Sequence, residues 1–183
     1  MADLPFSGII PSGDLSIEDR RRFRQNALQA LQDRAINVKR IGNSPDEIVI
    51  RDIIPDTDLG LGQRWWITAA LVAGAVNTYI NAALAAFRAV VFYGVNVESA
   101  APACSHIYFR SGPAGATTRG LANLECLYTP MESDGYLSKA VLYDPQETVF
   151  VQLWPRIASA GERIILRGAV AEPLGEAISG PIV

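Results

Sequence analysis

Cysteine and histidine are scarce in this chain, which limits the disulfide and metal chemistry that it can support. The 183 residues include two cysteines, Cys104 and Cys126, and one histidine, His106. Two cysteines are too few for a disulfide framework, so we interpret them as reduced, buried thiols, with a single bridge between them as the alternative. The three residues offer three zinc ligands, but no fourth follows at a recognisable spacing. We therefore expect an ordinary strand histidine, no bound metal and no cofactor.

Motifs of the common catalytic classes are also missing. The chain has no Gly-x-Ser-x-Gly elbow, and the glycine-rich residues 112–120 lack the Gly-Lys-Ser/Thr ending of a phosphate-binding loop. Scattered acids offer carboxylates for glycoside hydrolysis, but the sequence does not fix their separations. These acids are Glu125, Glu132, Asp134, Asp144 and Glu147. We therefore expect a protein that is not an enzyme.

Charged residues are also few. Charged residues make up 19% of the chain, and 16 basic residues are offset by 19 acidic ones, for a net charge of −3. This balance argues against a nucleic-acid-binding surface, and so few charges indicate that part of the surface contacts another protein. The basic cluster at residues 20–24 is interpreted as a solvated helix face. The first residues lack the basic and apolar regions of a signal peptide, so no secretion signal is expected.

The longest charge-free interval, residues 65–87, has the ~20-residue length of a membrane span. Trp65 and Trp66 would then lie at the membrane interface. Against a span stand Asn77 and Asn81, which are costly in hydrocarbon, and Arg88, which interrupts an apolar run that continues beyond it. We therefore predict buried β-sheet for residues 65–93 and no membrane contact. The alanine-rich residues 82–86 are compatible with either strand or a helical turn.

One helix is predicted, over residues 16–34. Ser16 can cap its first amides, while Glu18 and Asp19 lie at the positive end of the helix dipole. Leu28 and Leu31 belong to a set of apolar residues that recur at helical spacing.

The rest of the chain is typical of a protein made of short strands. Strands are predicted at residues 47–54, 65–72, 78–84, 88–97, 105–110, 121–128, 136–143, 147–154 and 162–170. Turn signals separate many of them at intervals of ~8–12 residues, the pattern of a sandwich or barrel, and residues 56–62 and 111–120 are predicted as loops. The predicted fold is therefore mainly β: an antiparallel β-sandwich or jelly-roll-like barrel with one N-terminal helix and extended terminal arms.

Three parts of the chain follow from these elements. Residues 1–36 are the N-terminal arm and helix, residues 37–171 the β-sandwich domain, and residues 172–183 the C-terminal extended tail. Apolar side chains in the first 15 residues alternate with prolines and glycines, which exclude a regular helix. This segment is either an arm laid on a neighbouring molecule or a segment folded back on its own domain. The candidate partner-binding residues are Leu4, Phe6, Ile9, Ile10, Trp65 and Trp66.

Two phrases carry a resemblance to a known class of proteins. The run VVFYGV at residues 90–95 and the run GAVAEPLGEAIS at residues 168–179 look like virion structural proteins of tailed bacteriophages. The closest class is that of capsid decoration or cement proteins. The resemblance implies a β-sandwich or jelly-roll domain that oligomerises and locks onto a shell through its arms. The implied partners are further copies of the chain and the major capsid protein or another virion protein, and the implied location is the virion, after synthesis in the host cytoplasm.

Other functions are compatible with the same fold. A phage tail or baseplate component is one alternative, and a carbohydrate-binding module with Trp65, Trp66 or Trp154 against sugar rings is another. A membrane-inserted protein is the least favoured alternative. A cement protein needs no active site, only a stable sheet core, an apolar contact surface and arms that become ordered on binding.

Overall fold

A computed structural model describes residues 8–37, 41–62, 65–99, 102–128 and 133–175. The strands are β1 (Ile9–Pro11), β2 (Ile48–Asp52), β3 (Asn77–Ala83), β4 (Ala89–Val97), β5 (Cys104–Ser111), β6 (Thr117–Asn123), β7 (Asp134–Tyr143), β8 (Thr148–Pro155) and β9 (Ile164–Pro173). The α-helices are α1 (Ile17–Asn37) and α2 (Pro55–Leu59). Single 3-10 turns are η1 (Ser12–Asp14), η2 (Pro45–Glu47), η3 (Pro113–Gly115) and η4 (Glu125–Leu127).

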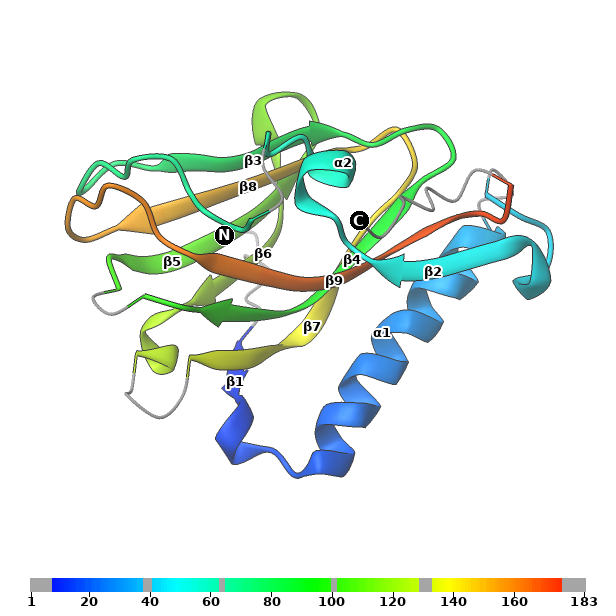
Figure 1. The fold of residues 1–183 in the computed structure, drawn as a ribbon, viewed down its shortest axis with the longest axis horizontal. Coiled ribbons are helices and arrows are strands. Elements are labelled where there is room, and N and C mark those ends of the chain that lie inside the picture. Colours follow the sequence, from blue (N-terminus) through cyan, green and yellow to red (C-terminus); the bar gives the residue numbers. More distant parts are fainter. Residues whose placement is uncertain (1–7, 38–40, 63–64, 100–101, 129–132, 176–183) are drawn as a thin grey trace.

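The strands form two antiparallel sheets packed face to face (Figure 1). One sheet has the strand order β1-β7-β4-β9-β2, and the other has the order β3-β8-β5-β6. Strand β2 pairs with β9, β3 with β8, β4 with β7, and β5 with β6. This is the arrangement of one long hairpin that is rolled up so that successive strand pairs alternate between the two sheets. This pairing is that of a jelly roll. The predicted β-sandwich with one N-terminal helix is therefore confirmed.

Alternating side chains from both sheets fill the core between them. Ile107 and Phe109 on β5 are fully buried, as are Val149, Val151 and Leu153 on β8. Each set has the two-residue spacing that places side chains on one face of a strand. The alternation predicted for these two strands is confirmed.

Strand β4 is buried on both of its faces. Phe92 and Val95 face the core between the sheets, whereas Val91 and Tyr93 face a second apolar cluster beneath α1. The pairing register shifts between Phe92 and Gly94 against both neighbouring strands. A strand covered on both faces reads as a continuous apolar run, which accounts for the phrase VVFYGV.

Helix α1 crosses the outer face of the five-stranded sheet (Figure 1). Ser16 Oγ accepts a hydrogen bond from the Asp19 amide at 3.1 Å and donates to the Asp19 carboxylate at 2.7 Å, so the predicted cap is confirmed. The helix ends at Asn37, three residues beyond the predicted end at Arg34. Its buried residue Leu31 packs in the cluster with β4 and β9. The helix therefore packs on its own domain rather than on a neighbour.

Three buried charged residues and the partly buried Arg51 join α2 to the ends of β2 and β9. Arg51 donates to both Asp58 oxygens at 2.7 Å and to Glu172 Oε1 at 2.6 Å. Arg88 donates to Glu172 Oε2 at 3.2 and 3.1 Å and forms an ion pair with Asp58 at 3.2 Å. We call Arg51, Asp58, Arg88 and Glu172 the charge quartet. Its two carboxylate side chains have no solvent exposure, so each depends on both guanidinium groups for compensation.

The predicted loop at residues 56–62 is wrong for its first part, where α2 forms. Pro55 occupies the first helical turn, and Asp58 Oδ2 accepts a hydrogen bond from the Ile54 amide at 2.7 Å. Gly60 ends the helix with a φ of 62°. Asp56 and Asp58 indicated a turn, but they lie in a short helix. The contacts of Asp58 with Arg51 and Arg88 hold this helix in place.

The predicted loop at residues 111–120 and strand at 121–128 are also partly wrong. Strand β6 begins at Thr117, and residues beyond Asn123 leave the sheet for η4. The turn between β5 and β6 is shorter than predicted and folds over Phe150, where a Cβ on Gly115 would lie 2.5 Å from the ring. Glycine-rich composition concealed the first half of β6, because glycine is disfavoured inside strands.

Buried sheet is confirmed for β3 and β4 but is wrong for residues 65–76. That segment makes two isolated bridges, Ile67 to Arg163 and Leu71 to Ser159, and most of its side chains are exposed. Residues 82–86 contain the end of β3 and a turn, not a helix. Within the described ranges, no helix is long and apolar enough to cross a membrane.

Candidate binding surfaces

An exposed apolar band lies at one end of the sandwich, where residues 65–76 run beside residues 154–163 (the teal loop and the orange hairpin on the left of Figure 1). Its large side chains are 38–63% exposed. We call them the apolar rim: Trp65, Ile67, Val72, Val76, Trp154 and Ile157. Backbone hydrogen bonds between the two segments hold it, including Leu71 N to Ser159 O at 2.8 Å and Gly74 N to Pro155 O at 3.0 Å. Exposed apolar area gathered in this way is typical of a protein interface.

The candidate partner-binding residues have different surroundings. Trp65 is 63% exposed on the rim, with Arg163 over its ring at 5.8 Å from the centroid. Trp66 is half-buried and packs against the core. Ile9 and Ile10 belong to β1, which pairs with β7 of the same chain, so this part of the segment folds back on its own domain. Leu4 and Phe6 lie outside the described residues.

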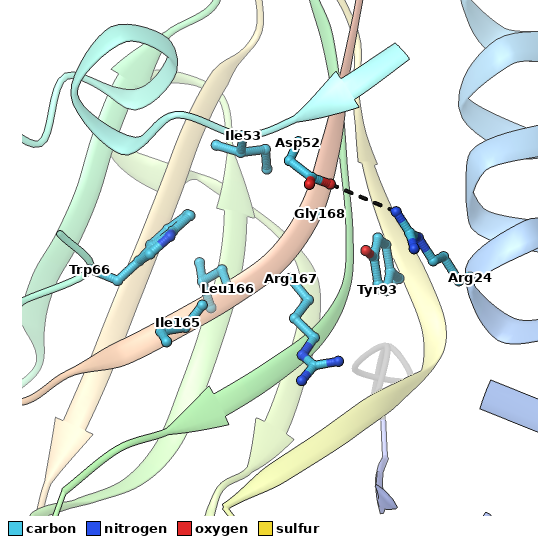
Figure 2. A pocket seen from close by; sticks show the side chains of 9 residues that line it. All are labelled: Arg24, Asp52, Ile53, Trp66, Tyr93, Ile165, Leu166, Arg167 and Gly168. Carbon is cyan, nitrogen blue, oxygen red and sulfur yellow. Dashed lines mark ion pairs between the residues drawn. The ribbon is translucent and has the colours of Figure 1, made fainter. Parts of the chain in front are cut away.

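Trp66 lines an open pocket of about 300 Å³ beside β9, just beyond the last residue of β2. Figure 2 shows Trp66 on one side of the pocket and Arg24 on the other, beside α1. Its arginines have acidic partners: Arg24 pairs with Asp52 at 3.9 Å, and Arg167 pairs with Asp134 at 2.9 Å. The pocket therefore presents little uncompensated charge to a ligand.

The same pocket offers no group suited to covalent chemistry. Burial raises the pKa of the Tyr93 phenol, which therefore stays protonated at neutral pH. The remaining lining residues are apolar or glycine: Ile53, Ile165, Leu166 and Gly168, together with Trp66. The pocket can accept a hydrogen-bonding group, but its lining supplies neither a nucleophile with a base nor a set of metal ligands.

A second depression, of about 260 Å³, lies on the solvent-facing side of the four-stranded sheet. We call it the outer groove: Val76, Tyr108, Arg110, Thr118, Leu121, Gln152 and Trp154. The register aligns these side chains in rows, because Tyr108 lies opposite both Gln152 and Leu121, and Arg110 lies opposite Thr118. Strands β5 and β8 are the two central strands of this sheet, so the groove has a rigid base.

The cysteines and the histidine do not form a reactive or metal-binding group. Cys104 is fully buried, and burial, with the nearby Glu162, raises the pKa of its thiol. Cys126 is exposed, so the prediction of two free thiols is confirmed but the prediction that both are buried is wrong. His106 lies half-buried on β5, with Nδ1 2.9 Å from Ser105 Oγ. The described residues contain no group of three side chains that could hold a metal ion.

The acids considered for a carboxylate pair are dispersed in separate ion pairs. Glu125 pairs with Arg156, Asp134 with Arg167, Asp144 with Arg34, and Glu147 with Arg119. Glu132 lies outside the described residues. The hydrogen bond from Arg34, with its charge, holds the pKa of the Asp144 carboxyl below its usual range. These contacts connect surface loops and strands rather than building an acid–base site.

Sequence reasoning singled out Trp154 but missed the other residues of the outer groove. Arg110, Gln152 and Thr118 are ordinary polar residues in sequence, and they meet only through the pairing of β5 with β8 and β6. One signal was available: Tyr108, Arg110, Gln152 and Trp154 occupy the polar positions of two strands whose other face is apolar. Which strands lie next to one another, and therefore which of these side chains meet, became known only from the fold.

Comparison with protein-family models gives no match for this chain, and comparison with curated protein sequences gives none either. The function must therefore be argued from the surfaces of the molecule.

Proposed function

We propose that the protein is a non-enzymatic structural protein of a viral particle, of the capsid decoration or cement class. In this proposal it binds the shell through the apolar rim. The rim is the observation that supports the proposal most directly, since it exposes two tryptophans and four aliphatic side chains along neighbouring segments. A role in solution alone would leave this apolar area in contact with water.

The fold is compatible with this role but does not select it. Jelly rolls occur in viral capsid proteins, in lectins and in cupins, so topology leaves several functions open. The described residues contain no group of three side chains that could hold a metal ion, so the binding surfaces are the features that a function has to explain. Among these surfaces, an apolar band of low charge favours a protein partner, because interface cores are depleted in charged residues.

The magnitude of rim burial indicates that further contacts are needed. Fully burying a large apolar side chain is worth about 1.5–3 kcal/mol, and the rim side chains are about half exposed, so the six together contribute roughly 5–9 kcal/mol. Association itself costs an estimated ~4–15 kcal/mol, so the rim alone gives at best weak binding. We therefore propose that binding is multivalent, through a homo-oligomer and through Leu4 and Phe6 on the major capsid protein or another virion protein. The location that goes with this proposal is the virion, after synthesis in the host cytoplasm.

The test is co-sedimentation of the full-length protein with shells of its own virus that lack it. Val72→Ser and Ile157→Ser each remove apolar area from the rim without touching the core, so both should weaken shell binding several-fold. The matched control is Ile17→Ser, since Ile17 is 67% exposed at the start of α1 and outside the rim. Sedimentation velocity of the same three variants should show a loss of oligomer only for the rim substitutions.

Three results would contradict the proposal. These are no binding to shells, equal binding by rim variants and the Ile17→Ser control, or a monomeric protein whose solubility is unchanged by the rim substitutions. Binding to isolated tails instead of shells would support a tail or baseplate component.

A further inference from the structure

We propose that the outer groove is a binding site for an acidic saccharide, with Arg110 pairing with the carboxylate and Trp154 stacking on a sugar ring. This site is independent of the viral proposal, because it is built by different residues, apart from Val76 and Trp154, on the face of one sheet. The groove contains a cation, Arg110, that lacks an acidic partner among the described residues.

Arg110 is half-buried at one end of the groove. Its Nη1 donates to Gln152 Oε1 at 3.0 Å, while its buried Nε has no hydrogen-bond partner. None of the ion pairs among the described residues includes Arg110, and the groove lining contains no acid. Arg110 therefore lines the groove as a cation without an acidic partner, which favours a ligand that carries a negative charge.

The polar groups of the groove are arranged as donors. Since Gln152 Oε1 already accepts from Arg110, its amide NH₂ is the half that remains to donate to a ligand. The side chains lie on rigid central strands, which hold Arg110 and Gln152 in fixed relation through their shared hydrogen bond. A carboxylate matches this arrangement, since guanidinium groups bind carboxylates in a planar, two-point geometry.

The length of the groove favours a saccharide over a single-ring acid. Arg110 lies opposite Phe150, and Trp154 is four residues further along β8, a separation of roughly 13 Å along the strand. The turn over Phe150 closes the Arg110 end, because Gly115 packs directly on that ring. A ligand that reaches both the guanidinium and the indole must therefore extend beyond one ring.

Aromatic side chains define the other end of the groove. Trp154 is 38% exposed, and Tyr108 lies between its row and that of Arg110. An indole presents a flat apolar face, with an electron-rich π system, against which the C–H face of a pyranose ring can pack. Thr118 adds a hydroxyl that can both donate and accept. Together these groups match a sugar chain of two or more rings in which one ring carries a carboxylate.

The test is isothermal titration of the full-length protein with four probes: trigalacturonate, 3′-sialyllactose, lactose and benzoate. At least one acidic saccharide should bind at least tenfold more tightly than lactose or benzoate, and its affinity should fall with added salt. Arg110→Gln should reduce that affinity about tenfold or more, and Trp154→Ala should also weaken it. Trp65→Ala is the matched control, because Trp65 is an exposed tryptophan outside the groove.

Several results would overturn the site. These are no binding of either acidic saccharide, equal affinity for lactose, equal affinity for benzoate, or an Arg110→Gln variant with unchanged affinity. The wild-type comparison among the four probes decides the question even where a variant folds poorly. Failure here leaves the shell-binding test unaffected, since that test uses Val72 and Ile157, which do not line the groove.

Discussion

Replacing Arg88 with methionine should test whether the charge quartet holds the sandwich together. Arg88 is the link between the two fully buried carboxylates, with contacts of 3.1–3.2 Å to Glu172 and 3.2 Å to Asp58. Methionine keeps an unbranched apolar chain but removes the guanidinium. Arg51 alone then faces two negative charges, so one carboxylate charge loses its compensation at a position with no solvent exposure.

The structure allows the size of this effect to be worked out. Removing one partner of a buried ion pair typically costs about 3–5 kcal/mol, because the remaining charge stays buried. The substitution also removes the hydrogen bond of 3.3 Å that Arg88 donates to the carbonyl of Thr57. For a domain of this size, each 1 kcal/mol lowers Tm by about 2–4 °C, so Tm should fall by roughly 6–20 °C.

The measurement is urea unfolding followed by tryptophan fluorescence and by circular dichroism. Arg22→Met is the matched control, because its pair with Asp19 is solvent-exposed on α1, with 71% of the Arg22 side chain accessible. That substitution should change the free energy of unfolding by less than about 1 kcal/mol. An Arg88→Met protein within about 1 kcal/mol of wild type would refute the reasoning, because the two carboxylates would then not depend on both guanidinium groups.

Three further predictions concern backbone strain, thiol access and pH. Gly115→Ala should lower the free energy of unfolding in urea by about 1–3 kcal/mol more than Gly60→Ala does. Gly115 and Gly60 both have a positive φ, of 68° and 62°, but only at Gly115 would a Cβ lie 2.5 Å from an aromatic ring, that of Phe150 on β8. With a thiol reagent, Cys126 should react in the native protein and Cys104 only after unfolding, because Cys104 is fully buried; rapid reaction of both would be inconsistent with the structure. The pKa of Asp144 is lowered in the folded state, so its stabilising contribution is present above the unfolded pKa of about 3.9 and is lost as the pH falls through the folded pKa. The stability gap between wild type and Asp144→Asn should therefore be below about 1 kcal/mol at pH 6 and shrink toward pH 3.

Local patterns predicted the elements whose environment is simple. The helix from Ser16 and the strands around Phe109 and Val151 each have one buried face, so periodicity alone located them. The short helix α2 and the beginning of β6 were missed for another reason. Their local composition favours turns, and long-range contacts override it: the charge quartet holds α2, and pairing with β5 holds β6.

Arg88 shows why some residues could not be assigned from sequence. In the linear sequence it interrupts an apolar run and argues only against a membrane span. In the fold it meets Glu172, which is 84 residues away, and Asp58, which lies on another element. Nothing in the local pattern indicates which acids compensate it, because the pairing depends on β4 and β9 being neighbours.

The phrases that resemble virion proteins also have a physical explanation in the fold itself. VVFYGV belongs to a strand buried on both faces and bulged at Gly94, and any jelly roll with a helix over one sheet imposes the same constraints. GAVAEP is the second part of the adjacent strand β9. Its first residue, Gly168, has no room for a side chain, because a Cβ there would lie 2.3 Å from the Val91 carbonyl oxygen. These phrases therefore support the fold more strongly than they support a viral role.

The charge-free interval divides into two parts that avoid charge for different reasons. Residues 77–87 lead through β3 toward the core, where burial of Tyr79, Ile80 and Leu84 is sufficient to exclude charge. Residues 65–76 have no such requirement, since Trp65 and Val72 lie in contact with water and charged residues would be tolerated there by the fold. Folding of the single chain thus explains the absence of charge in residues 77–87 but not in residues 65–76. A surface that stays apolar without a folding reason is the part of this sequence that calls for a partner, and the rim variants test that requirement directly.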